Sequence, residues 1–507
     1  MQKYLTTPIY YPNGLPHLGH AYTTILGDVF KKFEMMRGND VYYTTGVDEH
    51  GQKIQQTIEE KGVDAQEFLD GMAEKFKSLF VNLGIDFDYF VRTTRPGHEK
   101  IVQDVLMDIY NKGMIVKKSY EGLYCVGCEQ FKKESDLDAK GCCPDHQCPP
   151  KVISEENYFF KLEPARQWLI DQIKNNPDWI QPAHYAKEVL GMLNEPLEDL
   201  CISRPKTRVW HGVEMPFDKD FVTYIWFDAL LNYISTLEYG SNPDFNKFWE
   251  NSHHIIGKDI IKPHCIYWPI MLKAMGVNPV KHCFVHGFWI GEGGIKMSKS
   301  LGNVVDPVEV IDIIGVDALR FYLIENMSMT NDSQISIDLL KKGYKSVANN
   351  IGNLQMRVLK MVQKSLDGKI PASVSLNTED KKLIETTAKT FEKLYSKDMS
   401  QDVISDLSHA VVKAGDETNA YFAVNEPWKL VKEEGGKERF EAVVYTTLEM
   451  LRLIGIAAYP IMPETAEKIE ASLGINIGKF TADFEPFGLK SGGNVVVGDP
   501  LFPMLEE

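Results

Sequence analysis

The hydrophobic pattern of the first 113 residues alternates between strand-like and helix-like periods. Short apolar runs with strand character are interleaved with segments whose apolar residues recur every three or four positions, as on one face of a helix. The strand candidates are residues 3–9 and 40–45, and the helix candidates are residues 21–37, 65–83 and 98–112. Strands that alternate with helices predict a doubly wound α/β sheet with helices on both faces.

The second half of the chain returns to this pattern and then becomes helical. The β-rich segments are residues 221–233, 253–257 and 285–287, and short helices are predicted at 307–314 and 317–325. From about Leu339 the pattern is almost entirely helical, with breaks at Pro371 and Pro427. Such a run of helices is typical of a helix bundle.

These patterns divide the chain into a split α/β domain and a helical domain. We predict a Rossmann-type sheet in two halves, an insertion between them, and a loop region that leads into the bundle. The predicted boundaries are 1–113 and 221–295 for the two halves, 114–220 for the insertion, 296–345 for the loop region and 346–507 for the helical domain.

The composition indicates an ordinary folded protein. The 507 residues are 44% apolar with 25 Pro and 38 Gly, which disfavours disorder and allows three or four domains. There is no run of about 18 apolar residues and no charged-then-apolar leader, so we predict a cytoplasmic protein without a membrane span or secretory signal. The net charge of −16 argues against nonspecific binding to nucleic acid, but a local basic strip could still hold a folded RNA.

The turn after the first strand carries the first candidate chemistry. Residues 10–20 read Tyr-Tyr-Pro-Asn-Gly-Leu-Pro-His-Leu-Gly-His and lead into a helix whose free N–H groups would suit a phosphate. His17 and His20 share one face of the first turn, and Gly19 leaves bare backbone on which a flat ring could lie. The turn is neither a Walker loop nor a dinucleotide fingerprint. Taken alone, the two histidines would more often be a partly buried pair that caps the helix.

A second charged motif follows a glycine-rich run. Residues 296–303 read Lys-Met-Ser-Lys-Ser-Leu-Gly-Asn and come after Gly-Glu-Gly-Gly at 291–294. The glycine-rich run suits a loop that closes. Lys296 and Lys299 would then neutralise the charge that develops on a departing pyrophosphate.

An acidic side chain follows the second strand candidate. The ligand of an open parallel sheet lies beyond the carboxyl ends of the strands, so Asp48 would face the same crevice as His17 and His20. A carboxylate there could hold an ammonium group. The alternative is an N-cap for a helix that begins near Gln52, because Asp is a preferred cap residue.

Five of the eight cysteines fall within 24 residues, which indicates a metal site rather than a disulfide framework. Two residues separate Cys125 from Cys128, and two separate Cys143 from His146. This spacing can place four ligands tetrahedrally on zinc. Cys142 or Cys148 could replace Cys143 in this set. Four protein ligands leave no open position, so we predict one structural zinc per chain.

Two groups of aromatic residues are candidates for binding. Near the predicted strand ends of the second half, an apolar pocket with one imidazole would suit a thioether, and its members are Trp226, Tyr233, Ile260, His264 and Trp268. From periodicity alone these are core aromatics. In the helical half, Asn353 and Arg357 lie four apart on one helix face, and Trp428 follows Pro427 where a helix begins. Such a Trp could stack on unpaired bases, although an isolated Trp is more often a core residue.

Together these motifs resemble those of the class I aminoacyl-tRNA synthetases, and among them the methionyl-tRNA synthetases, over essentially the whole chain. The class I likeness rests on His-Leu-Gly-His at 17–20 together with Lys-Met-Ser-Lys-Ser at 296–300. The finer likeness rests on Thr6-Thr-Pro-Ile-Tyr-Tyr-Pro-Asn-Gly, Gly46-Val-Asp-Glu-His-Gly, the single zinc knuckle, Trp226-Phe-Asp-Ala-Leu, Gly257-Lys-Asp-Ile with His264 and Trp268, Asn353-Leu-x-x-Arg and Ala423-x-x-Glu-Pro-Trp.

The resemblance implies that ATP, with Mg²⁺, activates L-methionine to methionyl-adenylate, and that the methionyl group then passes to the 3′ end of tRNA(Met). The residues implied to stabilise the transition state at the α-phosphate are His17, His20, Lys296 and Lys299, and those implied to bind ATP also include Gly19 and Ser298. Asp48 would hold the substrate ammonium. The side-chain pocket would be Ile9, Tyr11, Trp226, Ala229, Tyr233, Ile260, His264 and Trp268, and the CAU anticodon would be read by Asn353, Arg357 and Trp428. The helical domain is then the anticodon-binding domain.

The sequence departs from this family pattern in a few places. Leu18 replaces the usual Ile of the first signature, and the extra Cys142 clouds the choice of zinc ligands. The chain stops soon after Leu501-Phe-Pro, so the dimerisation module of many relatives is missing and a monomer is expected.

Three rival functions have discriminating features. A cysteine enzyme of class I would use zinc to bind the substrate thiol, which a closed four-ligand site cannot do, and residues 114–220 leave no room for the editing insertion of the branched aliphatic enzymes. A small-molecule adenylyltransferase that shares His-x-Gly-His would not need the helical half. A tRNA-binding protein without activity would be free to lose His20 and Lys299.

Overall fold

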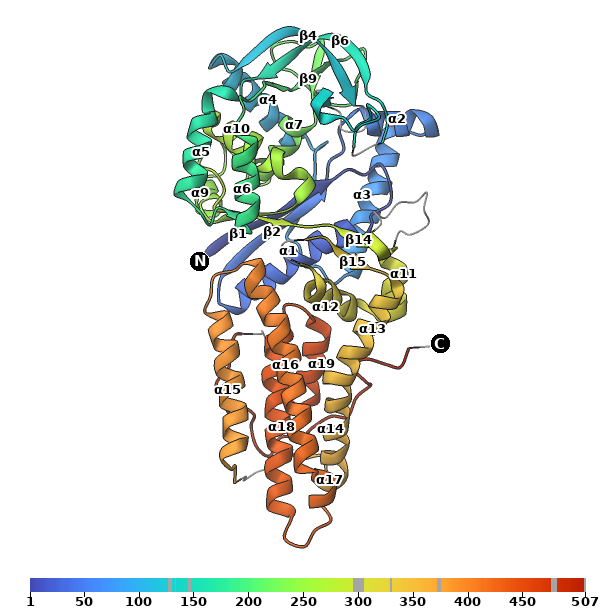
Figure 1. The fold of residues 1–507 in the computed structure, drawn as a ribbon, viewed down its shortest axis with the longest axis vertical. Coiled ribbons are helices and arrows are strands. Elements are labelled where there is room, and N and C mark those ends of the chain that lie inside the picture. Colours follow the sequence, from blue (N-terminus) through green and yellow to red (C-terminus); the bar gives the residue numbers. More distant parts are fainter. Residues whose placement is uncertain are drawn as a thin grey trace.

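The computed structural model is elongated, with an α/β part at one end and a helical bundle at the other (Figure 1). It describes residues 1–125, 130–132, 134–144, 147–294, 305–328, 331–371, 375–475 and 481–505. No described helix is long and apolar enough to cross a lipid bilayer.

A six-stranded parallel sheet forms the centre of the α/β part, in the order β3-β2-β1-β12-β13-β7. Its strands are β1 (Gln2–Tyr10), β2 (Asp40–Val47), β3 (Tyr89–Arg92), β7 (Ile180–Gln181), β12 (Ser252–Gly257) and β13 (His282–His286). The strand order reverses between β1 and β12, and an open α/β sheet binds its ligand at such a switch point. The predicted doubly wound α/β fold is confirmed.

Neighbouring residues of the central strands point to opposite faces of the sheet and pack in different cores. Leu5 and Ile255 belong to one hydrophobic core, whereas Tyr4 and Ile256 belong to the other. Helices α1 (Leu18–Met36) and α3 (Ala65–Asn82) contribute to the first core, and α4 (Pro96–Asn111) and α10 (Trp268–Met275) contribute to the second. Helix α2 (Gln52–Lys61) follows β2. Helices therefore cover both faces, as the pattern of the sequence predicted.

The segment predicted as an insertion, residues 114–220, is divided more finely than expected. Its main body is an antiparallel sheet of β4 (Ile115–Cys125), β5 (Gln130–Lys132), β6 (Lys151–Phe160) and β8 (Leu200–Cys201). Between β6 and β8 the chain returns to the central sheet, where β7 pairs with β13 and is accompanied by α5 (Arg166–Asn175) and α6 (Ala183–Met192). A two-residue strand leaves no periodic signal, so the sequence could not reveal this return.

The strand predicted at residue 221 also differs from expectation. β11 (Phe221–Thr223) pairs antiparallel with β9 (Ser203–Pro205) and β10 (Val213–Glu214) in a separate small sheet and does not join the central one. The chain returns to the α/β part only through the short helices that follow: α7 (Trp226–Leu230), α8 (Asn232–Ser235) and α9 (Phe245–Trp249).

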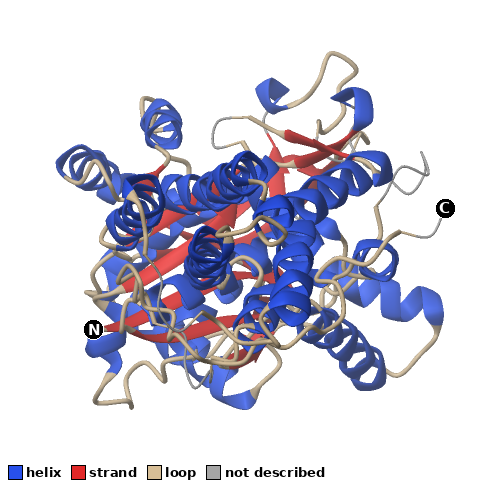
Figure 2. Ribbon diagram, turned by 90° about the horizontal axis from the view of Figure 1, so that it is seen from below, coloured by secondary structure: helices blue, strands red, loops and turns tan. Residues whose placement is uncertain are grey.

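A linking region connects the sheet to the bundle. After β13 come β14 (Trp289–Gly291), α11 (Pro307–Ile314), α12 (Val316–Asn326) and β15 (Ser333–Ile335), and β14 pairs in parallel with β15. The bundle is formed by α13 (Ile337–Val347), α14 (Asn353–Ser365), α15 (Thr378–Tyr395), α16 (Gln401–Asn425), α17 (Pro427–Leu430), α18 (Lys437–Ala458) and α19 (Pro463–Ser472). Pro427 opens α17, as predicted from its fixed φ. Seen from below, the bundle helices are viewed nearly end-on in front of the sheet (Figure 2).

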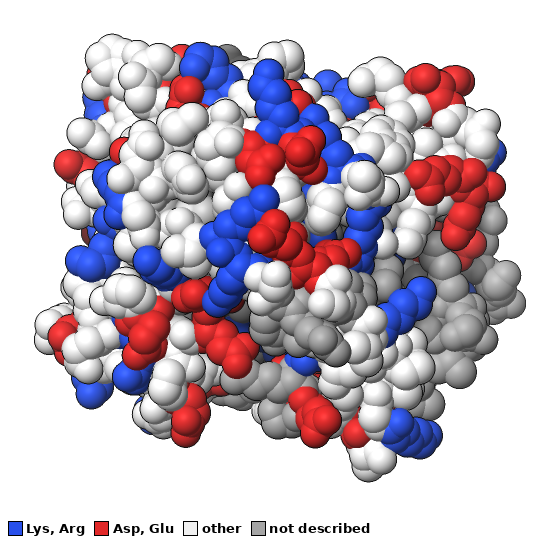
Figure 3. Space-filling view, turned by 90° about the horizontal axis from the view of Figure 1, so that it is seen from above, with Lys and Arg blue, Asp and Glu red and all other residues white. Residues whose placement is uncertain are grey.

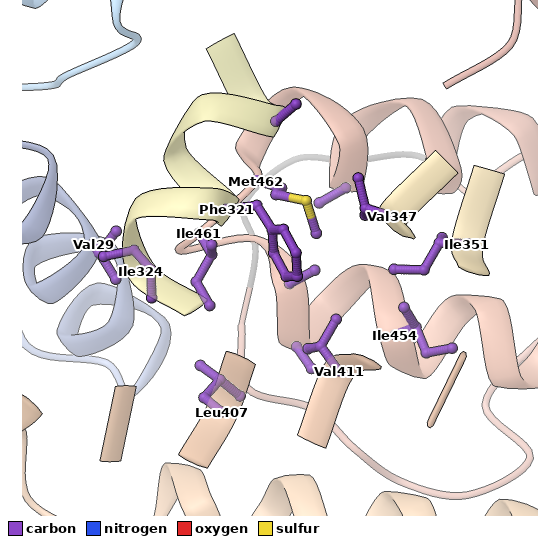
Figure 4. Close-up of a cluster of buried hydrophobic side chains, with 14 of the residues drawn as sticks. Val29, Phe321, Ile324, Val347, Ile351, Leu407, Val411, Ile454, Ile461 and Met462 are labelled. Atoms are coloured by element: carbon purple, nitrogen blue, oxygen red, sulfur yellow. The ribbon is translucent and has the colours of Figure 1, made fainter. Parts of the chain in front are cut away.

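One hydrophobic core runs from the sheet into the bundle without interruption. Figure 4 shows Val29 of α1 beside Ile324 of α12, with Ile461 from the loop before α19 next to them. Helix α18 is buried along nearly its whole length and forms the centre of the bundle. The two parts of the molecule therefore share one continuous apolar core.

A buried arginine adds polar contacts at this junction. Arg320 of α12 donates from Nη2 to Asp28 Oδ2 of α1 over 2.6 Å, and both side chains are inaccessible to solvent. The same guanidinium donates to the carbonyls of Leu83, Pro460 and Ile461 at 3.2, 3.0 and 2.9 Å. One side chain thus joins α1, the end of α3 and the loop between α18 and α19.

Candidate functional site

Two histidines stack at the start of α1, next to the carboxyl end of β1. His17 is the N-cap residue of α1, and the ring centroids of His17 and His20 lie 3.7 Å apart. Nδ1 of His17 accepts from the Gly19 N–H over 3.1 Å, and Nδ1 of His20 accepts from the His17 N–H over 3.2 Å. In its neutral form each ring therefore carries its proton on Nε2. The pair offers two stacked N–H donors above the sheet.

The surroundings of His20 keep it neutral. Its ring lies 4.7 Å from that of Tyr10 and 5.2 Å from that of Phe76, centroid to centroid. Burial lowers the pKa of His20 well below its ordinary value, and the neighbouring His17 lowers it further. A neutral imidazole with a fixed tautomer is a hydrogen-bond donor rather than a counter-ion. A Cβ on Gly19 would lie 3.0 Å from the His17 ring, so a larger residue here would crowd that ring.

Asp48 lies directly after β2 and is only 4% exposed. Its backbone N–H donates to the Tyr10 carbonyl over 2.9 Å, which fixes it beside the end of β1, and Thr93 Oγ1 lies 3.5 Å from its Oδ1. The N-cap of α2 is Gly51, so the capping role is excluded for Asp48. A buried carboxylate at this edge of the sheet suits a cationic partner.

The predicted aromatic pocket is assembled; the polar atoms of Tyr233 and His264 are hydrogen-bonded, whereas the buried Trp226 Nε1 has no hydrogen-bond partner among the described residues. His264, in a π-helical turn (Pro263–Tyr267), donates from Nδ1 to the Ile260 carbonyl over 2.8 Å, so its Nε2 accepts from the Tyr233 hydroxyl over 2.7 Å. Burial lowers the pKa of His264 to about 4, although the Ile260 carbonyl opposes this shift. The Trp226 ring lies edge-on to His264, 6.0 Å away. The pocket is thus uncharged.

His254 of β12 supports this pocket through contacts with Trp268, Tyr233 and Thr6. Trp268 donates from Nε1 to His254 Nε2 over 3.1 Å, and His254 Nδ1 lies 2.7 Å from Thr6 Oγ1 of β1. The rings of Tyr233 and His254 stack at 4.0 Å. Burial lowers the pKa of His254 well below its usual value, so this ring is also neutral. No local signal in the sequence distinguishes His254, because a histidine in a buried strand looks like any other core position.

The remaining predicted methionine-site residues are distributed around the same edge of the sheet. Ile9 and Tyr11 flank Tyr10 at the end of β1. Ala229 is buried in α7, and Trp226 and Ile260 are half-buried.

The lysines of the second signature, Lys296 and Lys299, and the neighbouring Ser298 lie outside the described residues. The chain before these lysines is described up to residue 294. Gly293 and Gly294 have φ angles of +76° and +80°, which favour glycine and fit the predicted loop.

Two of the four predicted zinc ligands are described, and both are buried: Cys125 and Cys143. Cys128 and His146 lie outside the described residues. The Cys143 N–H donates to the Cys148 carbonyl over 2.9 Å, and the pKa of the Cys148 thiol is raised by desolvation and by Cys125. Within the described ranges, no group of three or more His, Cys, Asp or Glu side chains converges as a metal site.

The predicted anticodon residues lie together on the bundle. Arg357 of α14 stands over the Phe422 ring of α16 with 5.3 Å between Cζ and the centroid, and Phe422 lies 6.1 Å from Trp428. Trp428 is 40% exposed, which argues against a core role. Asn353 is exposed and donates from Nδ2 to Asn349 Oδ1 over 2.9 Å. The structure thus brings the three predicted residues to one region of the surface.

Charge on the molecular surface is mixed. On the face seen from above, Lys and Arg side chains alternate with Asp and Glu side chains (Figure 3). Lys117, for example, lies 3.2 Å from both Glu156 and Asp218. This face carries no broad basic field, in keeping with the net charge.

Family models match nearly the whole chain. A model described as "tRNA synthetases class I (M)" matches residues 3–149 and 146–359. A second, described as the anticodon binding domain of methionyl tRNA ligase, matches residues 370–507.

Relatives and solved structures agree with these matches. The chain is 40% identical to a methionine--tRNA ligase of Clostridium tetani over 99% of this chain and 78% of that protein. It is 39% identical to the corresponding Streptomyces coelicolor protein, covering 99% of this chain and 97% of the other. Its fold matches a crystal structure of Mycobacterium tuberculosis methionyl-tRNA synthetase bound by methionyl-adenylate, with a TM-score of 0.93, 33% identity and coverage of 99% and 100%. For the apo form of that enzyme the TM-score is 0.87 at 30% identity, with coverage of 100% and 98%.

Proposed function

The chain belongs to the family of class I methionyl-tRNA synthetases, and from this premise we propose how its own residues divide the work of the reaction. The enzyme activates L-methionine with ATP to methionyl-adenylate and pyrophosphate, then transfers the methionyl group to the 3′ end of tRNA(Met) and releases AMP. No residue has to act as a nucleophile, because the substrate carboxylate attacks the α-phosphate. The protein supplies position and charge stabilisation.

The observation that supports this division is that three kinds of group meet at the carboxyl edge of the sheet. They are a buried carboxylate at Asp48, the stacked donors His17 and His20, and the uncharged pocket around Tyr233 and His264. They match the ammonium, the phosphate and the thioether of methionyl-adenylate. Amino-acid-dependent exchange between ATP and pyrophosphate, measured across the twenty amino acids, tests the assignment. Absence of exchange with methionine would overturn it.

The two histidines act as hydrogen-bond donors to the reacting phosphate. Because Nδ1 of each ring accepts a backbone N–H, the ring proton of each neutral histidine is on Nε2, and this is the donor that we assign to the phosphate. Neutral donors that are fixed before the reaction cost no reorganisation when charge develops on the α-phosphate oxygens. Mg²⁺ is expected to accompany ATP. Gly19 gives the nucleotide access to the backbone between the two rings.

The pocket favours methionine because most of its hydrogen-bonding groups are already paired with one another. The Tyr233 hydroxyl and the His264 ring are committed to each other and to the Ile260 carbonyl, so they offer no free donor to a polar side chain. A thioether needs none and gains from contact with polarisable aromatic rings. The buried Trp226 Nε1–H, which has no partner among the described residues, could meet only a single acceptor, so a side chain that needs several hydrogen bonds would leave polar atoms unsatisfied.

Lys299→Ala should slow adenylate formation far more than it weakens methionine binding. The lysine charge matters chiefly when pyrophosphate departs, so its loss lowers kcat with little change in methionine KM. Pyrophosphate exchange measured over a range of methionine concentrations separates the two effects. A rise in methionine KM at normal turnover would contradict the role.

We also propose one structural zinc at the cysteine-rich turn. The buried thiols of Cys125 and Cys143, with Cys148 close by, fit the thiolate chemistry that zinc prefers, and Cys128 and His146 complete the proposed set. Four protein ligands would leave the metal no place for a substrate. Its contribution would be to the folding of this turn.

Metal analysis of two variants tests the ligand set. Cys143→Ser should abolish stoichiometric zinc, whereas Cys148→Ser should retain it, since Cys148 is exposed and outside the proposed set. The circular dichroism of the metal-free protein should show local rather than global loss of structure. Loss of zinc from Cys148→Ser alone would replace Cys143 by Cys148 as the third ligand.

We propose that Asn353, Arg357 and Trp428 read the CAU anticodon. Trp428→Ala should then lower aminoacylation efficiency roughly 10- to 100-fold at limiting tRNA, because stacking one base on an aromatic ring contributes about 1–3 kcal/mol. Methionine-dependent pyrophosphate exchange should stay normal, because it does not involve tRNA. A tRNA with an altered first anticodon base should show no further loss in the variant if the contact is to that base. Early melting together with loss of exchange would instead make Trp428 a core residue.

The remaining assignments are a cytoplasmic location and a monomeric enzyme. Light scattering of the purified protein tests the oligomeric state directly.

A further inference from the structure

A single buried carboxylate joins four separate elements beside the proposed methionine site. Asp228 of α7 is inaccessible to solvent, and both of its oxygens accept hydrogen bonds. Nδ1 of His50 donates to Oδ2 and Nε2 of His98 donates to Oδ1, each over 2.7 Å. The other ring nitrogen of His98, Nδ1, lies 2.7 Å from Ser235 Oγ. The network ties together α4, α7, α8 and the loop after β2.

Three of these four elements also carry residues assigned to methionine. The loop after β2 carries Asp48 two positions before His50, α7 carries Trp226 and Ala229 on either side of Asp228, and α8 carries Tyr233 two positions before Ser235. Asp228 therefore connects the segment that carries Asp48 with the helices that carry the thioether pocket. Asp228 itself is part of neither subsite.

The start of α7 requires such support, because the residue before it is strained. Ile225 has φ of +63° and ψ of −140°, a region that β-branched residues rarely adopt. A conformation of this kind persists only where the surrounding structure over-determines it. The paired contacts of Asp228 supply α7 with charged links to two other elements.

The pair is ionised at neutral pH. Burial lowers the pKa of His50, but Asp228 outweighs it and raises that pKa to about 10; burial raises the pKa of Asp228, but His50 and His98 bring it down to about 2. Two other groups face His50. Glu99 lies 3.7 Å from His50 Nε2, and the pKa of His211 is lowered to about 4 by burial and by His50. Asp48 also favours the charged form of His50.

We propose that Asp228 is a positioning residue that fixes the distance between Asp48 and the thioether pocket, and so controls methionine affinity without touching the substrate. The span from ammonium to sulfur is set by the bonds of methionine, so both ends can bind fully only if the two subsites keep their spacing. The inference rests on the proposed roles of Asp48 and the pocket.

Asp228→Asn is the first test, because it keeps the shape of the side chain and removes its charge. In methionine-dependent pyrophosphate exchange, we expect methionine KM to rise roughly 10- to 100-fold, the scale of effect of a 1 Å misplacement in a binding site. ATP KM should change by less than about 2-fold. An equal rise in both constants, or no rise in methionine KM, would overturn the proposal.

The matched control is Glu449→Gln in α18. Glu449 is equally buried and accepts from Arg452 Nε over 2.9 Å, but it lies within the helical bundle. Its replacement should lower the melting temperature without changing methionine KM. If Glu449→Gln raises methionine KM as much as Asp228→Asn does, the effect is one of general stability and the proposal fails.

A deaminated methionine analogue separates positioning from simple damage to the pocket. It uses the thioether pocket but not Asp48, so its inhibition constant should be nearly the same in wild type and Asp228→Asn. The ratio of methionine affinity to analogue affinity should fall in the variant. The ammonium would no longer reach Asp48 while the sulfur is bound in the pocket. Weakening of both ligands by the same factor would contradict positioning.

His98→Gln and Ser235→Ala keep the test decisive if Asp228→Asn fails to fold. Each breaks one contact of the network, so each should raise methionine KM by a smaller factor, roughly 2- to 10-fold. Unchanged KM in both variants would refute the role. If the wild-type enzyme itself shows no exchange with methionine, the proposed function fails instead, and this outcome is distinct from a negative result in the variants.

Discussion

Asp48→Asn should raise the methionine concentration required for half-maximal pyrophosphate exchange by at least about 30-fold. The carboxylate is only 4% exposed and lies at the edge of the sheet where the ligand is expected. Loss of one partner from a buried, charge-assisted pair costs about 2–5 kcal/mol, and each 1.4 kcal/mol corresponds to about tenfold in affinity. Asparagine keeps the size of the side chain, so the loss reports the charge. Steady-state exchange kinetics and direct calorimetric titration with methionine should agree.

The deaminated analogue provides the control for Asp48→Asn. Since it has no ammonium group, it should inhibit wild type and variant equally well. If the variant loses affinity for the analogue as strongly as for methionine, then the substitution has disturbed the pocket and Asp48 is not the ammonium partner. ATP KM measured at saturating methionine should change little in the variant, because Asp48 is assigned to the amino acid.

Arg320→Met should lower the free energy of unfolding by about 3–5 kcal/mol, the usual cost of removing one partner from a buried ion pair. Asp28 would keep only Lys32 as a charged partner, and three backbone carbonyls would lose their donor. Burial raises the pKa of Asp28, but Lys32 and Arg320 together hold it below its ordinary value, so the lost contact is an ionic one at neutral pH.

The location of Arg320 makes a second outcome measurable. Because this residue links α1 to the loop between α18 and α19, its loss should separate the unfolding of the bundle from that of the α/β part. Urea unfolding followed by far-ultraviolet circular dichroism should then show two transitions where the wild type shows one.

Arg439→Met is the matched control for Arg320→Met. Arg439 also donates two hydrogen bonds to a buried carboxylate, that of Asp380, but both residues lie within the bundle. This variant should be destabilised without any separation of the two transitions. A single transition in Arg320→Met, at wild-type stability, would show that the apolar packing alone holds the parts together.

The sequence by itself determined those features that rest on short-range signals. Strands β1 and β2 and helices α1, α3 and α4 follow from the apolar period, and α1 and α3 lie within a few residues of their predicted bounds, whereas the four-residue strand β3 was not predicted. The pairing of His17 with His20 is equally local, because a capping geometry within four residues makes it.

Only the tertiary structure decided how distant segments meet. The return of β7 to the central sheet, and the pairing of β11 outside it, depend on partners far away and on strands too short to carry a period. Asp228 has no local feature to distinguish it from a helix cap, yet its partners lie 178 and 130 positions away in the chain. Arg320 would be expected on the surface of an amphipathic helix. It is buried because Asp28, 292 positions away, and two carbonyls of the bundle loop meet its donors there. Long-range polar contacts of this kind are set by how the elements pack, and packing leaves no periodic trace in the sequence.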